Sequence, residues 1–186
     1  MKQLPLAVVI ALPLSALAQE GETQSRDLSY TYAELRYLDT DGGGDGLRLR
    51  GSYALDDEWI IVGGLTSLDF SRNVDATTIE IGAGYVYDFD GDFDLVATLQ
   101  FVNSEVDTPG GDADDNGLSI SAGARGTITD EFEVRGAVHH VNLDNNDTYL
   151  ELAGDYYFSD TFSVGASLEF AGDNDVFSIG VRLYFR

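Results

Sequence analysis

Phe177-Ser-Ile-Gly-Val-Arg-Leu-Tyr-Phe185 alternates strictly between apolar side chains and small, polar or amphipathic ones. Successive side chains of a β-strand point to opposite faces, so this period of two puts the apolar residues on one face and Arg182 on the other. The same alternation recurs over residues 118–128 and 162–170, and no comparable helical period appears. The sequence therefore predicts an all-β fold.

Ten strands of 10 to 12 residues follow when the alternation is traced along the chain. A tilted strand needs roughly 9–11 residues to cross the hydrocarbon core of a membrane, so these lengths suit membrane strands. Short turns alternate with connections of up to 13 residues, which is typical of outer-membrane barrels. We expect a closed antiparallel up-and-down transmembrane β-barrel. Its predicted strands are 28–38, 46–55, 59–69, 76–87, 93–103, 117–128, 132–143, 148–158, 162–171 and 176–186.

The first 18 residues have the three parts of a secretory signal peptide. They are the positive Lys2, an apolar run over residues 4–17 and the small-x-small sequence Ala16-Leu17-Ala18. The run has 14 residues, whereas a membrane-spanning helix needs about 20. We therefore expect a cleaved signal over 1–18, a short polar segment over 19–27 and the barrel over 28–186.

Composition excludes several classes of protein. The chain has no cysteine, so neither a lipid-anchored lipoprotein nor a disulfide framework is possible. Its formal net charge is −23, which makes nucleic acid a poor partner. Strongly acidic chains with few aromatic residues are often disordered, but this one has 10 Tyr and 10 Phe and is expected to fold.

The identity of the two strand faces predicts which one contacts lipid. One face is apolar with aromatic residues near the strand ends, as in a membrane barrel, and the other is charged. The facing of strand 59–69 is assigned by analogy, because both of its faces are apolar. The aromatic residues expected at the periplasmic end are Trp59, Tyr87, Phe93, Phe132, Phe158, Phe162 and Phe185, and those at the outer end are Tyr37, Phe101, Phe170 and Phe177.

The charged face would line the lumen. Arginine suits bidentate contacts with carboxylates, so one interpretation is an ion-pair core that fills the barrel. The other is the selectivity lining of a conducting pore. A barrel of about eight to ten strands has little interior width, which favours the filled core. The residues expected in this network are Glu34, Arg36, Arg48, Arg50, Glu80, Arg125, Glu133, Arg135, Glu151, Glu169 and Arg182.

Acidic residues around glycines in the connections are candidate calcium ligands, because calcium takes several carboxylate oxygens. No segment has the EF-hand order with its closing glutamate, so solvated turns are the alternative. A bound divalent cation could also bridge to lipopolysaccharide phosphates. The candidates are Asp39, Asp41, Asp45, Asp88, Asp90 and Asp92.

His139 and His140 are adjacent in a strand and must face opposite ways, so they cannot bind one ligand together. His139 would face the lumen, but no flanking motif supports a catalytic role. We expect no enzyme activity and no cofactor.

The opening Tyr30-x-Tyr32-x-Glu34, the second strand Gly46-Leu47-x-Leu49-x-Gly51-Ser52 and the aromatic last strand resemble the OmpA/OmpX-type outer-membrane β-barrel family. Members of that family often have eight strands, which is the alternative to ten. The resemblance implies an outer-membrane location and a structural or surface-interaction role, with a narrow porin-like channel as the alternative. Implied partners are outer-membrane lipid, lipopolysaccharide and the outer-membrane assembly machinery, and we expect a monomer.

Overall fold

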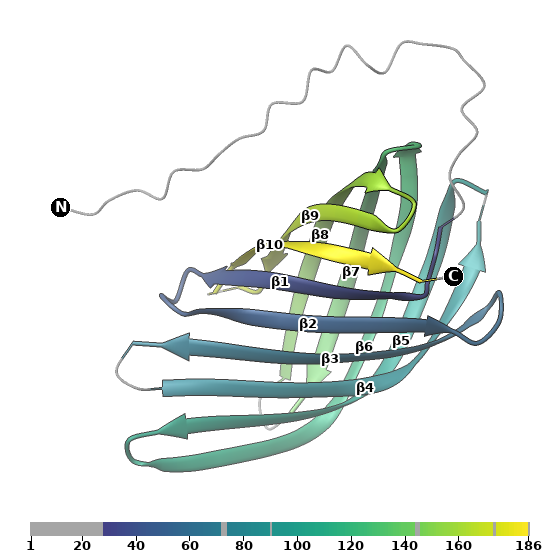
Figure 1. Ribbon diagram of the computed structural model, residues 1–186. Coiled ribbons are helices and arrows are strands. Elements are labelled where there is room, and N and C mark those ends of the chain that lie inside the picture. The colour runs from purple at the N-terminus through teal and green to yellow at the C-terminus, as the bar shows by residue number, and fades with distance from the viewer. Residues whose placement is uncertain (1–27, 72–73, 90, 144–145, 173, 186) are drawn as a thin grey trace.

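The computed structural model describes residues 28–71, 74–89, 91–143, 146–172 and 174–185. The expected signal peptide and polar segment, residues 1–18 and 19–27, lie outside the described residues, and no helix in the described part is long and apolar enough to cross a membrane. The chain forms ten strands (Figure 1). They are β1 (Tyr32–Thr40), β2 (Asp45–Ala54), β3 (Trp59–Phe70), β4 (Val74–Asp88), β5 (Phe93–Thr108), β6 (Gly111–Thr129), β7 (Phe132–Asn142), β8 (Asn146–Ser159), β9 (Phe162–Phe170) and β10 (Val176–Tyr184).

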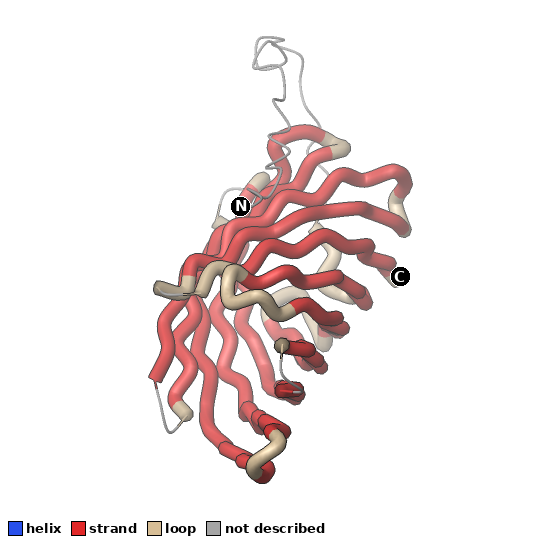
Figure 2. The backbone as a smooth tube through the Cα atoms, turned by 90° about the vertical axis from the view of Figure 1, so that its left-hand side faces the viewer, coloured by secondary structure: helices blue, strands red, loops and turns tan. Residues whose placement is uncertain are grey.

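Each strand pairs antiparallel with its neighbours in sequence, and β10 pairs with β1 to close the barrel. The closing ladder runs from Tyr32 opposite Tyr184 to Thr40 opposite Val176. Figure 2 shows the strands curving around one interior, with loops only at their ends. Closure leaves no unpaired sheet edge along the barrel wall. The predicted ten-stranded, closed antiparallel barrel is confirmed, and the eight-stranded alternative is wrong.

The expected alternation of short turns with longer connections is not observed, because the strands are joined by two to four residues at one end of the barrel and by two to five at the other. One end, called the turn end below, carries the β2–β3, β4–β5, β6–β7 and β8–β9 turns, and β1 begins and β10 ends there. Asp56 tightens the first of these turns, because its Oδ1 accepts hydrogen bonds from the backbone N–H groups of Glu58 (2.9 Å) and Trp59 (2.7 Å). Gly91 has a φ of 84°, and its N–H donates to Asp88 Oδ1 over 2.8 Å. The opposite end is called the loop end.

The hairpin β5–β6 corrects one prediction. Residues 104–116 were expected to form a long loop, but β5 continues to Thr108 and β6 begins at Gly111. Only Pro109 and Gly110 connect them, and Gly111 takes the left-handed φ of 136°. The acidic residues there gave no apolar alternation, although their backbone pairs normally. The predicted loop residues therefore extend the sheet at the loop end.

Side chains alternate between lumen and outward face as expected. On β3, Trp59, Ile61 and Leu65 are 43–49% exposed while Ile60 is 4% exposed, so the facing assigned by analogy is confirmed. Outward aromatic residues at the turn end include Trp59, Tyr87 and Phe185. Phe101 does not mark the loop end of β5, because that strand continues to Thr108.

Candidate functional site

The lumen near the turn end contains a fully buried ion-pair network centred on Arg182. Arg182 is 0% exposed and donates from Nε (2.9 Å) and Nη2 (2.6 Å) to Glu34 Oε2. Its Nη1 donates to Glu133 Oε1 (3.0 Å) and to the Tyr184 hydroxyl (3.0 Å). Arg182 on β10 therefore joins carboxylates on β1 and β7.

Glu133 is itself fully buried and is shared by several donors. Arg125 on β6 donates to it bidentately, from Nε and Nη2, each over 2.8 Å. The Tyr157 hydroxyl on β8 also donates to this carboxylate. Planar guanidinium groups match carboxylates in this geometry, which explains why every basic residue of the network is arginine.

Arg36 extends the network toward the middle of the barrel. Its Nε lies 2.8 Å from Glu34 Oε1 and its Nη2 lies 3.2 Å from Asp155 Oδ1. Asp155 is 2% exposed. The alternation of β8 predicts its place on the same lumen face as Glu151, but it was not among the residues expected in the network.

Glu151 is the centre of a second group of ion pairs, in the middle of the lumen. Arg50 Nη1 (3.2 Å), Arg135 Nη2 (2.9 Å) and His139 Nε2 (3.4 Å) surround its carboxylate. The imidazole of His139 stacks on the ring of Tyr149, with centroids 4.6 Å apart. His139 does face the lumen as expected, and its carboxylate neighbour also binds two arginines.

Arg48 forms the remaining pair. Its guanidinium contacts both carboxylate oxygens of Glu169, and its Nε donates to Thr66 Oγ1 over 3.2 Å. Ten of the eleven residues expected in the network therefore form ion pairs. The eleventh, Glu80, faces the lumen but makes no ion pair with any described residue.

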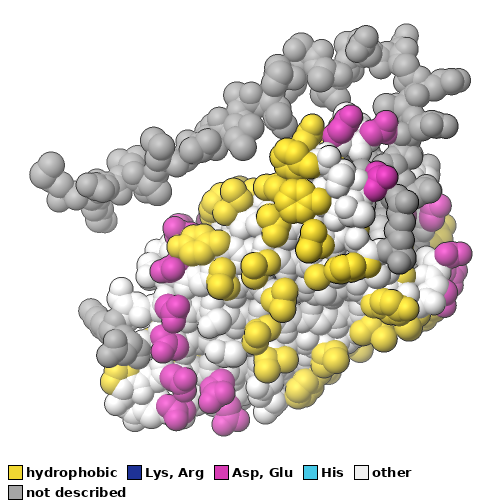
Figure 3. All heavy atoms as spheres, viewed as in Figure 1, with side chains coloured by type: hydrophobic (Ala, Val, Ile, Leu, Met, Phe, Trp, Pro, Cys, Tyr) yellow, Lys and Arg dark blue, Asp and Glu magenta, His cyan; other side chains and the backbone are white. Residues whose placement is uncertain are grey.

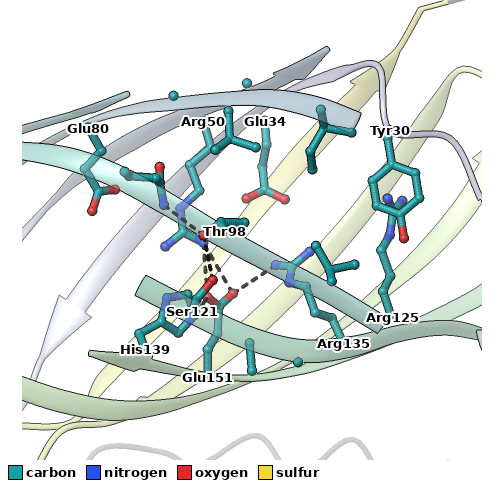
Figure 4. A pocket seen from close by; sticks show the side chains of 18 of the residues that line it. Tyr30, Glu34, Arg50, Glu80, Thr98, Ser121, Arg125, Arg135, His139 and Glu151 are labelled. Carbon is teal, nitrogen blue, oxygen red and sulfur yellow. Dashed lines mark hydrogen bonds and ion pairs between the residues drawn. The ribbon is translucent and has the colours of Figure 1, made fainter. Parts of the chain in front are cut away.

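A cavity of about 130 Å³ lies in the lumen beside these clusters (Figure 4). Arg50 on β2, Arg135 on β7 and Glu151 on β8 line it, and the smaller side chains of Thr98 on β5 and Ser121 on β6 line it as well. One water occupies about 30 Å³ in the liquid, so the cavity has room for a few waters. Tyr30 and Tyr32 line its turn end.

Tyr30 belongs to a segment that the alternation misplaced. The first strand was predicted to begin at residue 28, but β1 begins at Tyr32. The Tyr30 hydroxyl donates to Asp94 Oδ2 over 2.7 Å, and the Arg125 guanidinium lies 4.6 Å from the ring centroid. Arg125 Nη1 also donates to the backbone oxygen of Ser29 over 2.9 Å. The segment therefore turns into the mouth of the barrel.

Outside the lumen, the described chain carries carboxylates but no arginine. At the loop end, six outward aspartates stand directly opposite one another on six consecutive strands, so that each has another aspartate as cross-strand partner. Figure 3 shows acidic side chains along this edge and apolar ones across the middle of the barrel. The aspartate row, as we call it, consists of Asp39, Asp45, Asp69, Asp75, Asp107 and Asp112.

The calcium candidates fall at opposite ends of the barrel. Asp39 and Asp45 are cross-strand partners at the loop end, and Asp41 lies in the turn beside them. Asp88 and Asp92 lie at the turn end, and Asp90 is outside the described residues. Among the described residues, no group of three or more His, Asp or Glu side chains is arranged to hold a metal ion. The calcium sites stay a prediction.

Solved structures share the fold at low sequence identity. The KdgM porin matches with a TM-score of 0.54 and 11% identity, over 83% of this chain and 99% of that one. The NanC porin matches with a TM-score of 0.53 and 11% identity, over 82% and 100%. The KdgM porin in complex with disordered oligogalacturonate matches with a TM-score of 0.50 and 11% identity, over 83% and 99%. No curated protein sequence matches the chain.

The sequence itself matches a family model over most of its length. That model describes the outer membrane protein beta-barrel domain, and the match covers residues 4–170. Together with the closed barrel and its apolar outward face, the match places the protein in the cell outer membrane, with its strands crossing the bilayer. The chain belongs to the outer membrane protein beta-barrel domain family.

Proposed function

We propose that this protein is a closed, non-enzymatic barrel with a structural or surface-interaction role, whose lumen is blocked by its ion-pair network. The observation that carries the proposal is the burial of charge. Seven lumen side chains are at most 3% exposed although all are charged: Glu34, Arg36, Arg125, Glu133, Glu151, Asp155 and Arg182.

Burial at this level requires partners. A charged group without water costs several kcal/mol unless it is paired and hydrogen-bonded. Here arginines from β1, β6 and β10 meet carboxylates from β1, β7 and β8, so the network ties together strands that are not neighbours in the sheet. Such a network supports a rigid plug rather than a hydrated path along that side of the lumen.

The described residues also support the absence of enzyme activity. His139 contacts Glu151, but two arginines share that carboxylate. Ser121, the cross-strand neighbour of His139, instead shares a hydrogen bond of 2.7 Å with Thr98. A nucleophile bonded to its base is the signature of covalent catalysis, and this cluster lacks that arrangement.

The proposed partners are supported by the outward face. Its apolar band is suited to outer-membrane lipid. The aspartate row lies at the loop end, which we propose is the external side because β1 begins and β10 ends at the opposite end. We propose that lipopolysaccharide surrounds this rim and that the rim keeps the barrel surface acidic. The outer-membrane assembly machinery would insert the protein, which we expect to function as a monomer.

Planar-bilayer recording tests the blocked lumen. The folded wild-type barrel should give no current above baseline, whereas the double variant Glu133→Ala/Arg182→Ala should conduct, because it removes the two side chains at the centre of the plug. The matched control, Glu105→Gln, changes an exposed residue and should stay silent. A steady single-channel current from the wild-type protein would refute the proposal.

A narrow channel is the second candidate, favoured by the cavity beside the network and by the likeness to porin folds. Arg50 and Arg135 are 21% and 17% exposed at that cavity, so part of the lumen wall is hydrated. The acidic rim would repel anions such as the oligogalacturonate bound to the KdgM porin. If the wild-type protein conducts, the reversal potential in a salt gradient should therefore indicate preference for cations.

A further inference from the structure

The segment before β1, residues 28–31, crosses the turn end of the barrel. Its bonds reach β5 through Asp94 and β6 through Arg125. In the ring of ten strands, β6 lies five strands from β1 in either direction and is therefore on the opposite wall. A segment that leaves β1 and bonds to β5 and β6 must span the mouth. We call residues 28–31 the strap.

The strap is continuous with the sheet only at one residue. Phe185 N–H donates to the Thr31 carbonyl over 2.9 Å, which extends the β1–β10 ladder by one step. On the β2 side, Ala54 N–H donates to the Thr31 hydroxyl over 3.2 Å instead of to a backbone carbonyl. Before Thr31 the long-range contacts of the strap are to Asp94 and Arg125, on the far side of the lumen.

Tyr30 is the residue of the strap that lines the lumen cavity. It lines the turn end of the cavity together with Tyr32 and Arg125 (Figure 4). Its ring lies against the Arg125 guanidinium while its hydroxyl bonds to Asp94. Arg125 also pairs bidentately with Glu133, so the same arginine belongs to the plug and to the anchor of the strap.

We propose that the strap is a gate at the periplasmic mouth of the barrel. When Tyr30 is released from Asp94 and Arg125, the lumen cavity becomes connected to the periplasm, while the Arg182 network stays in place. This inference rests on the proposed orientation and blocked lumen. Few contacts hold the strap, whereas several shared charges hold the network, so the strap should open at a lower free energy than the plug. The strap would then decide which molecules of the periplasm reach the lumen.

Cysteine labelling tests this proposal cleanly, because the chain has no cysteine of its own. Val96 lines the cavity, so Val96→Cys places one thiol behind Tyr30. The probe is a water-soluble, positively charged methanethiosulfonate, added to the folded barrel in detergent. Adding Tyr30→Ala should accelerate labelling about tenfold, the effect of losing about 1.4 kcal/mol of strap contacts.

Two further variants separate the contacts of Tyr30. Tyr30→Phe keeps the ring over Arg125 and loses the bond to Asp94, so it should give a smaller acceleration than Tyr30→Ala. Asp94→Ala removes the acceptor and should act in the same direction as Tyr30→Phe. A control thiol, Gly110→Cys at the tip of the β5–β6 hairpin, should react equally fast in all backgrounds.

Heat-modifiability on gels selects the variants that fold. Equal labelling of the Val96→Cys thiol in otherwise wild-type, Tyr30→Ala and Asp94→Ala backgrounds would overturn the strap proposal. That outcome would leave the blocked lumen untouched, because wild-type conductance tests it separately. Conversely, a conducting wild-type protein would refute the blocked lumen even if labelling still depended on Tyr30.

Discussion

Arg182 on β10 and Glu133 on β7 are three strands apart in the barrel, yet Arg182 Nη1 lies 3.0 Å from Glu133 Oε1, and both side chains are 0% exposed. No backbone hydrogen bond links these two strands, so this ion pair connects them directly through the lumen. The same arginine also binds Glu34 on β1, next to β10. The interior thus joins parts of the wall that the sheet itself does not join.

Removing Arg182 should therefore be strongly destabilising. Arg182→Ala leaves Glu34 and Glu133 buried with fewer partners, and loss of one member of a buried ion pair costs about 3–5 kcal/mol. Glu105→Gln is the control, because Glu105 is exposed near the loop end of β5, and it should change the stability by less than about 0.5 kcal/mol. Urea unfolding in lipid vesicles, followed by the fluorescence of the single tryptophan, measures both. A loss below about 1 kcal/mol for Arg182→Ala would contradict the role given to the network.

The lipid-facing side can be tested at Ile81. This residue is 61% exposed in the outward apolar band of β4. Ile81→Arg should destabilise the barrel by about 2–4 kcal/mol in a bilayer, whereas Ser67→Arg, at an exposed outward position near the loop end of β3, should cost about 0–1 kcal/mol. The measurement is vesicle-based urea unfolding of the two variants side by side. Equal, small effects would mean that water, not hydrocarbon, covers Ile81.

The alternation predicts the architecture well because its information is local. Whether Leu183 faces out and Arg182 faces in depends on the period of two along one strand, so the strand number and the lumen residues could be predicted. Which carboxylate Arg182 meets depends on strands 49 and 148 residues away in sequence. No local pattern contains that information, so the partners had to come from the structure.

Two local errors have physical causes. The aspartates within residues 112–115 have low β-propensity, so this stretch was predicted to be a loop. In the structure its backbone pairs with β5, and the residues belong to β6. Tyr30 keeps the alternation of Tyr32 and Glu34, so the pattern extended β1 too far. Its bonds to Asp94 and Arg125 pull it across the mouth instead, and this tertiary contact overrides the local period.

The aspartate row should carry a measurable electrostatic strain. Asp75 stands between Asp69 and Asp107, and like charges directly opposite each other are destabilising. Asp75→Asn should therefore raise the free energy of unfolding by about 0.2–1 kcal/mol at low ionic strength. In 1 M salt, where the Debye length is about 3 Å, the gain should largely disappear. Asp56→Asn at the turn end keeps the side-chain oxygen that accepts its two hydrogen bonds and serves as control. A gain that does not depend on salt would point to a cause other than charge repulsion.

Tyr30 should titrate at unusually alkaline pH. It precedes β1, outside the strands that cross the membrane, and burial raises the pKa of its phenol, an effect that Arg125 on β6 opposes and that Asp94 on β5 and Glu133 on β7 reinforce. Because the pKa is higher in the folded barrel than in the unfolded chain, where it is about 10, the phenol contributes stability that is complete below about pH 10. That contribution is lost as the pH rises further, through the folded-state pKa.

Ultraviolet titration of tyrosinate in wild-type and Tyr30→Phe barrels measures this directly. Their difference spectrum isolates one tyrosine, which should remain protonated at pH values where an ordinary tyrosine ionises, near about 10. The stability difference between the two proteins should be constant up to that pH and shrink above it. Tyr30→Phe retains the aromatic contact with Arg125, so the comparison reports on the hydroxyl and its bond to Asp94. If the difference spectrum shows ionisation at about pH 10, the ordinary value, the phenol is in contact with water and the strap does not close the mouth.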